Sequence, residues 1–87
     1  MGKTGKKIKR MLAQGHFALS LHAAERSAER MISESDIMEC GASAKKVVFQ
    51  EDKGTWKVNG SDLDGEDLTV VCKLKGDLLI VTMYRKS

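Results

Sequence analysis

The feature that most constrains the fold is a change of hydrophobic period near residue 46. Before this point apolar residues recur at the three- and four-residue spacing of amphipathic helices, and after it they alternate with polar residues as in strands. Helices followed by strands are typical of the α+β class. Because 87 residues suffice for one modest core, we expect a single domain over residues 1–87. It divides into a basic N-terminal helix (1–15), a second helical part (16–45) and an antiparallel sheet (46–87).

Three helices are predicted in the first half from apolar spacing, over residues 5–14, 21–31 and 34–43. Each follows a hydroxyl residue that can cap it: Thr4, Ser20 and Ser33. Asp36, three residues after Ser33, completes a capping box. Residues 16–19, between the first two helices, are expected to form a short extended connection.

The faces of the second and third helices are predicted from their side chains. On a helical wheel four apolar residues of the second helix cluster, and we expect them to face the core together with Ile32: Leu21, Ala24, Ala28 and Met31. In the third helix Gly41 and Ala44 lie on one side, where their small size would allow close packing.

Four strands are predicted in the second half: residues 46–50, 55–59, 68–75 and 78–84. Asp52-Lys53-Gly54 and Gly76-Asp77 supply turn residues for hairpins, and residues 60–67 form a polar loop. The last strand is apolar on both faces, so we place it centrally. The predicted architecture is a four-stranded antiparallel meander with three helices packed on one face.

Charge distribution, hydrophobic runs and cysteine content limit the classes of protein to which this chain can belong. The formal charge of +3 is uneven, because residues 1–10 carry five basic residues and no acid, whereas residues 51–67 are acidic. No apolar run is long enough to span a bilayer, and no signal peptide is recognisable, so we expect a cytoplasmic protein. In that reducing compartment Cys40 and Cys72 should act as small buried hydrophobes. The acidic run Asp62–Asp67 lacks EF-hand spacing and predicts a turn; no metal or cofactor is expected.

The most informative segment lies in the second helix. His22, Arg26 and Arg30 follow one another at four-residue intervals, which places them in one stripe on the helix. An imidazole can transfer a proton near neutral pH, and two guanidinium groups can hold a phosphate. This combination suits a phosphodiester site. The alternative is an exposed helix face on which the arginines pair with Glu25 and Glu29.

Further basic and aromatic residues are candidates for binding a nucleic acid. Tyr84 near the chain end could stack on a base, although the end of the last strand could equally be an ordinary exposed edge. The candidate nucleic-acid-binding residues are Lys6, Lys7, Lys9, Arg10, Lys73, Thr82 and Arg85. The cluster in the first helix could equally be a solubilising tail. Trp56 is interpreted as an anchor of the core or sheet.

The segment from His22 to Ile37 resembles the motif of the DUF4258 family of small bacterial proteins, roughly H-A-x-x-R-M-x-E-R-G-I-S-x-x-D-I. Residues 64–71 and 79–84 are similar to the family's two C-terminal strands. The chain departs from the motif at Ser27, where Met is usual, and at Met31, where Gly is usual. The second departure calls into question the tight turn between the second and third helices.

The resemblance implies a fold similar to the RelE/barnase-like group of small RNases and toxins. By this analogy the chain would be a toxin-type, metal-independent endoribonuclease acting on RNA, with a cognate antitoxin protein as a partner. His22 would be the general acid or base, Arg26 and Arg30 would hold the scissile phosphate, and Tyr84 would position or stack a base. Two alternatives remain: a non-catalytic protein- or nucleic-acid-binding module using the basic first helix, and a structural dimer paired through a sheet edge.

Overall fold

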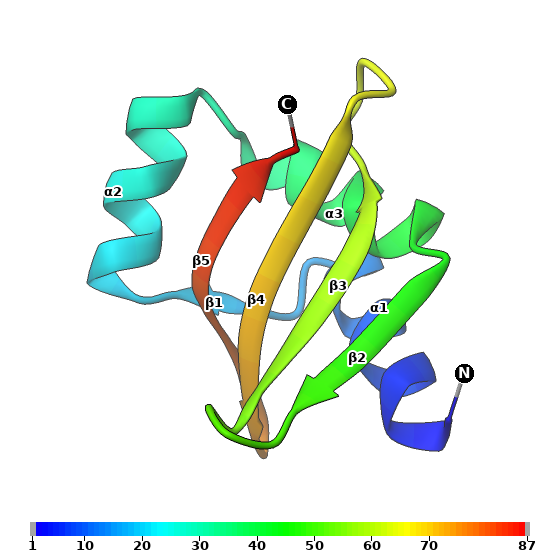
Figure 1. The fold of residues 1–87 in the computed structure, drawn as a ribbon. Helices are drawn as coiled ribbons and strands as arrows, with labels where there is room; N and C mark the ends of the chain where they lie inside the picture. The colour runs from blue at the N-terminus through cyan, green and yellow to red at the C-terminus, as the bar shows by residue number, and fades with distance from the viewer. Residues whose placement is uncertain (1, 87) are drawn as a thin grey trace.

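The computed structural model describes residues 2–86. Its elements follow the chain in the order α1 (Lys3–Ala13), β1 (Ala18–Leu19), α2 (Leu21–Arg30), α3 (Glu34–Ser43), β2 (Lys46–Gln50), β3 (Thr55–Ser61), β4 (Asp67–Lys75) and β5 (Asp77–Arg85). Figure 1 shows helices first and a sheet second, so the predicted α+β class is confirmed.

The sheet has five strands in the order β1-β5-β4-β3-β2. The prediction of four antiparallel strands was wrong in this detail, because Ala18 and Leu19 pair in parallel with Leu79 and Ile80 of β5. A two-residue strand carries no alternation in its sequence, so only its position beside β5 reveals it. This pairing gives β5 neighbours on both sides, as its apolar faces predicted.

Most element boundaries differ from the sequence prediction by one or two residues. Asp77, predicted in the turn with Gly76, is the first residue of β5 and pairs with Lys75. Strand β3 extends to Ser61, two residues beyond the predicted end, because Gly60 and Ser61 pair with the start of β4. Helix α1 begins at Lys3 with Gly2 as its N-cap, so Thr4 lies inside the helix and is not the cap. The caps at Ser20 and Ser33 are confirmed, and the Ser33–Asp36 capping box is complete.

One face of the sheet packs against α1 and α3, which lie behind it in Figure 1. Glycines bring these layers close together. A Cβ on Gly41 would lie 2.5 Å from Cβ of Leu12 in α1, and one on Gly60 would lie 2.2 Å from the carbonyl oxygen of Cys40 in α3. The predicted close packing at Gly41 is therefore confirmed. The fully buried core joins both helices to β3, β4 and β5 through Ile8, Leu12, Ile37, Cys40, Val58, Val70, Cys72, Ile80 and Met83.

Helix α2 lies beside β5 at the edge of the sheet, apart from the layer formed by α1 and α3 (Figure 1). The expectation that its apolar wheel positions face the core was wrong: Leu21 is 80% exposed and Met31 84% exposed. The side chain that α2 buries is that of Ala23, and Ile32 just beyond the helix is buried as expected. A helix at a sheet edge needs small residues at the contact, and hydrophobicity alone does not identify that side.

The tight turn after α2 forms although Met31 stands where the resembled motif has glycine. Met31 adopts the left-handed conformation, with φ 52° and ψ 46°. Glycine reaches this region without steric cost, whereas a residue with a Cβ is strained there. The Ser27 hydroxyl donates to the carbonyl oxygen of Ile32, and the Arg85 guanidinium donates to the carbonyl oxygen of Met31 at 3.2 Å. These hydrogen bonds hold the turn that the sequence left in question.

Candidate nucleic-acid interface

The face of the sheet opposite α1 and α3 carries no helix in Figure 1, and we call it the open face. Directly paired residues of neighbouring strands point to the same side of a sheet. The pairs Lys57–Val71–Thr82 and Asn59–Thr69–Tyr84 therefore share this face, as do Lys73 and Leu79. We define the open face by these residues: Lys57, Asn59, Thr69, Val71, Lys73, Leu79, Thr82 and Tyr84.

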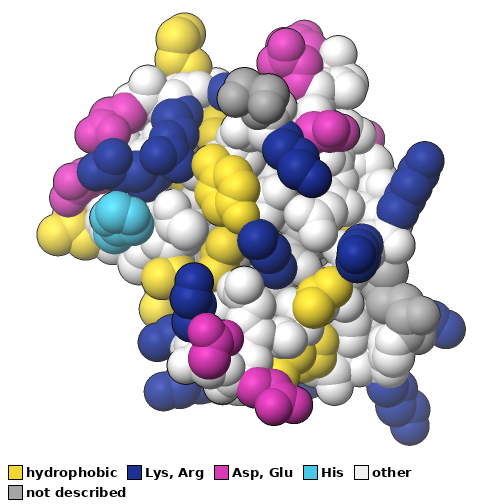
Figure 2. All heavy atoms as spheres, in the orientation of Figure 1, with side chains coloured by type: hydrophobic (Ala, Val, Ile, Leu, Met, Phe, Trp, Pro, Cys, Tyr) yellow, Lys and Arg dark blue, Asp and Glu magenta, His cyan; other side chains and the backbone are white. Residues whose placement is uncertain are grey.

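The open face combines one aromatic ring with cationic and hydrogen-bonding groups. Tyr84 is half-buried, and the ammonium nitrogen of Lys57 lies 5.9 Å from the centre of its ring. The Thr69 hydroxyl donates to the side-chain oxygen of Asn59 at 2.9 Å. Lys73 is half-buried, farther along β4. Figure 2 shows Lys and Arg side chains around hydrophobic side chains on this side of the molecule. Such a surface can contact bases and phosphates together.

Arg30 joins α2 to the open face. Its guanidinium donates a 2.6 Å hydrogen bond to the carbonyl oxygen of Met83, on the edge of β5. Together with Tyr84 and Arg85 it lines a shallow hollow. The structure therefore brings three predicted site residues, Arg30, Tyr84 and Arg85, to one place. The hydrogen bond to Met83 also gives Arg30 a structural role, because it satisfies a backbone carbonyl at the edge of β5.

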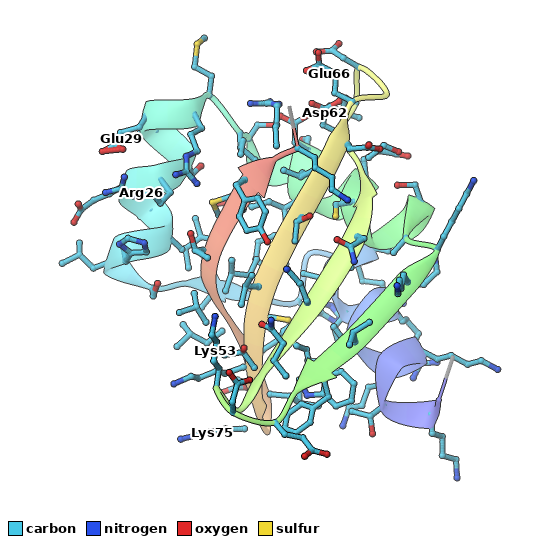
Figure 3. The ribbon with its side chains drawn as sticks, in the orientation of Figure 1. Arg26, Glu29, Lys53, Asp62, Glu66 and Lys75 are labelled. Carbon is cyan, nitrogen blue, oxygen red and sulfur yellow. The ribbon has the colours of Figure 1, made fainter. Side chains whose placement is uncertain are left out.

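Arg26 and His22 lie farther along the same helix. Arg26 forms an ion pair with Glu29 at 2.8 Å, and the two side chains lie next to each other on α2 (Figure 3). Its Nε is buried and has no hydrogen-bond partner among the described residues. His22 is exposed, and two helical turns, or about 11–12 Å, separate it from Arg30. Within residues 2–86, no side chain orients the imidazole of His22 through a hydrogen bond.

Arg85 is held by the scaffold. Its Nε donates to the Asp62 carboxylate at 2.9 Å, and its Nη atoms donate to the carbonyl oxygens of Arg30 and Met31. The hydrogen bond with Arg85 lowers the pKa of Asp62 below its ordinary value, and the same bond raises the pKa of Arg85. Figure 3 shows Asp62 and Glu66 at the loop before β4, near the end of β5. Arg85 thus connects this loop, β5 and the end of α2, and these contacts engage three of its five N–H donors.

The loop around Asp62 is the turn that the sequence predicted. One Asp62 oxygen accepts hydrogen bonds from the backbone N–H groups of Asp64 and Glu66, both at 2.9 Å. Asp36 supports the loop by accepting from the N–H of Leu63 at 3.0 Å. Burial pushes the pKa of Asp36 upward, but hydrogen bonds from Leu63 and Ser33 outweigh it and the pKa is lowered. The search of residues 2–86 finds no group of three His, Cys, Asp or Glu side chains suited to a metal ion.

The basic residues of α1 lie away from the open face, since α1 packs behind the sheet (Figure 1). Lys6, Lys7 and Arg10 are exposed. Lys9 instead donates to the carbonyl oxygens of Ala42 and Ala44, at 2.7 and 3.0 Å, and so caps the C-terminal end of α3. The predicted nucleic-acid-binding residues therefore do not share one surface: those of the first helix lie on α1, whereas Lys73 and Thr82 lie on the open face. Arg85 pairs with Leu68, whose side chain is buried on the packed side of the sheet, so Arg85 lies on neither surface.

Sequence reasoning missed Lys57 and Asn59 as candidates. The sequence could have indicated them, because Lys57 and Asn59 alternate with Trp56 and Val58 along β3 and must therefore lie together on its polar side. Trp56 lies on the packed side, where its ring centre is 4.9 Å from that of Phe49 and it borders the core. The interpretation of Trp56 as an anchor is confirmed.

Fold and surface together define a small α+β domain whose open sheet face carries Lys57, Lys73 and Tyr84, with Arg30 beside it. Residues 19–85 match the family described as "Domain of unknown function (DUF4258)", and the chain belongs to that family. The family resemblance is therefore confirmed. No curated protein and no solved structure matches the chain. None of the helices within residues 2–86 has both the length and the apolar character needed to cross a membrane.

Proposed function

We propose that this protein binds single-stranded RNA on the open face of its sheet. The observation that carries the proposal is the arrangement of Tyr84, Lys57 and Arg30 on and beside that face. Unpaired bases stack on aromatic side chains, and lysine and arginine neutralise the adjoining phosphates. A free sheet face suits an extended strand, because successive bases can lie across neighbouring β-strands.

A binding assay with matched variants tests this proposal. Fluorescence anisotropy with a labelled unstructured RNA should show affinity that falls with salt. Tyr84→Ala should weaken binding by about 5- to 150-fold, since one stacked base contributes about 1–3 kcal/mol. Leu63→Ala, in the exposed loop 62–66, is the control and should bind like the unmodified protein. Equal affinity of folded Tyr84→Ala and unmodified protein would refute the proposed surface.

A second comparison separates the open face from α1. Lys57→Gln should reduce the number of phosphates neutralised, which lowers the steepness of the salt dependence by about one contact. The double variant Lys6→Gln/Lys7→Gln changes only exposed residues on the other side of the molecule. It should affect binding little. A dominant effect of the Lys6/Lys7 variant would instead support the alternative binding module that uses the basic first helix.

RNA cleavage is the second candidate function, and it rests on α2. The helix places His22 and Arg26 along the same edge of the sheet as Arg30, and the buried Nε of Arg26 lacks a partner within the described residues. In a metal-independent endoribonuclease of toxin type, His22 would transfer the proton and the two arginines would stabilise the negative charge on the phosphate. The motif shared with the DUF4258 family implies a fold similar to the RelE/barnase-like group, and this analogy motivates the candidate; an antitoxin protein would then be the partner.

Cleavage has its own test. Purified protein should cut RNA in the presence of EDTA, and His22→Ala should lose this activity while still binding RNA. Glu25→Ala, an exposed neighbour on α2, is the matched control. Undiminished cleavage by His22→Ala would exclude the role of this residue. Binding by the unmodified protein without any cleavage would favour the non-catalytic module. Growth arrest on expression, relieved by the product of an adjacent gene, would support the toxin assignment.

A further inference from the structure

The two edges of the sheet are treated differently by the fold. At the β5 edge, β1 pairs with the strand, and beyond it Ser20 N–H donates to the carbonyl oxygen of Ile80 while Arg30 donates to that of Met83. At the other edge β2 (Lys46–Gln50) is the last strand, and within residues 2–86 no strand pairs with its outer side. Figure 1 shows β2 at the edge farthest from α2. The backbone groups on that side are available to another chain.

The centre of β2 lacks the features that normally prevent edge pairing. It has no proline, its register with β3 is regular, and its centre is the apolar run Val47-Val48-Phe49. Val48 is 39% exposed and Phe49 is 44% exposed. Edge strands usually carry a charge, a bulge or a proline at such positions to avoid association. An apolar, regular and uncovered edge strand therefore indicates a pairing surface.

Charges at the two ends of β2 specify the partner. Lys45 and Lys46 begin the strand, and Glu51 and Asp52 follow it. If a second copy pairs antiparallel about Val48, Lys45 lies opposite Glu51 of that copy, and a shift by one position places Lys46 opposite Glu51 and Lys45 opposite Asp52. Opposite charges across strands stabilise such pairs, and like charges destabilise them. Parallel pairing of two copies would place lysine beside lysine. The strand is thus complementary to itself in the antiparallel direction alone.

We propose that two copies of this chain associate by antiparallel pairing of their β2 strands, forming one continuous ten-stranded sheet. Val48 of each copy then lies opposite Val48 of the other, and Phe49 packs against Val47 across the interface. Val48 pairs with Lys57, so it points to the open face in both copies. The two open faces therefore lie on the same side of the joined sheet.

The size of the contact sets its strength. A five-residue strand contributes about 17 Å of paired edge, which is less surface than a standard interface of roughly 1,600 Å². Association should therefore be reversible and concentration-dependent, with a dissociation constant in the micromolar range. Sedimentation should show a mass that rises with concentration from 9.6 kDa towards twice that value.

Substitutions at the strand test the pairing. Val48→Lys places two lysines face to face at the symmetry axis and should yield monomer at all concentrations. Leu63→Lys adds the same charge at an exposed loop position and should leave the association unchanged. Circular dichroism establishes that both variants are folded. A monomeric mass for the unmodified protein at high concentration, or an unchanged dimer in Val48→Lys, would overturn the proposal.

Charge exchange tests the direction of pairing. Lys45→Glu/Lys46→Glu should dissociate the dimer, and adding Glu51→Lys/Asp52→Lys to the same chain should restore it, since every opposite-charge pair is then rebuilt in reverse. A purely structural role of the lysines would not be rescued in this way. Val48→Cys should also be joined to itself by a short bis-maleimide, whereas Leu63→Cys should not. The native thiols do not interfere, because Cys40 and Cys72 are buried. Failure of both the rescue and the crosslink would exclude antiparallel β2 pairing.

Discussion

Substituting Gly60 by alanine would place a methyl group at the contact between β3 and α3. That Cβ would lie 2.2 Å from the carbonyl oxygen of Cys40 and 3.0 Å from the hydroxyl oxygen of Ser43. The first distance is about 1 Å too short for nonbonded atoms. The Cys40 oxygen belongs to a helix backbone and cannot rotate away, so α3 and β3 must separate. Forced expansion of a packed core costs about 1–3 kcal/mol, and a backbone clash belongs in the upper part of that range.

The expected effect can be expressed as a melting temperature. For 87 residues the unfolding entropy is about 180 cal/mol/K, so a loss of about 2–3 kcal/mol lowers Tm by about 11–16 °C. Thermal unfolding followed by circular dichroism measures this shift. Gly2→Ala is the control, because a Cβ there meets no atom within 4 Å, and the altered N-cap should cost about 0.5 kcal/mol or about 3 °C. Equal Tm values for the two variants would refute the close approach of α3 to β3.

Three further predictions concern strain, acid stability and thiol chemistry. Met31→Gly should raise Tm by about 3–5 °C in the same assay, because relief of the left-handed strain, about 1–2 kcal/mol, exceeds the entropic cost of glycine, about 0.5–1 kcal/mol; an unchanged or lower Tm would contradict this. Asp62 has a lowered pKa, so its stabilising effect is complete above the unfolded-state pKa, near 3.9, and is lost as pH falls through the folded value. Asp62→Asn should therefore lower Tm at neutral pH and flatten its decline below about pH 4 in a pH series, and an equally steep decline would count against the Arg85 contact. Burial raises the pKa of Cys40 and Cys72 to about 12, so a thiol reagent at pH 8 should label them only after denaturation, and rapid labelling of the native protein would disprove their burial.

Most elements could be predicted from the sequence because their signals are local. The capping box at Ser33, the hairpin at Gly76 and the alternation along β4 each depend on neighbouring residues, and all are present. The short strand β1 could not be predicted in this way. Its pairing with β5 joins residues about 60 positions apart, and a two-residue segment has no period of its own.

The main error of the sequence prediction concerns which side of α2 is buried, and this error has a physical cause. A helical wheel assumes that the apolar side is buried, but α2 turns Ala23 inward and leaves Leu21 exposed. At a strand edge, free backbone carbonyls attract donors, and Arg30 satisfies one of them. The stripe containing Arg26 and Arg30 is consequently directed toward the sheet edge, where the sequence had suggested either a catalytic row or a solvated surface. Contact between these residues and RNA stays a prediction.

The way in which α2 is attached has a consequence for motion. The helix buries one small side chain, Ala23, and is otherwise fixed at its ends, by Ser20 at the start and by Arg30 and Arg85 at the finish. Segments with few buried apolar contacts open at a lower free energy than the rest of a domain. Amide hydrogens of α2 should therefore exchange faster than those of α3, whose Ile37 and Cys40 are fully buried. Because His22 and Arg26 lie between these two polar attachments, local opening of α2 should change their position relative to the edge of the sheet.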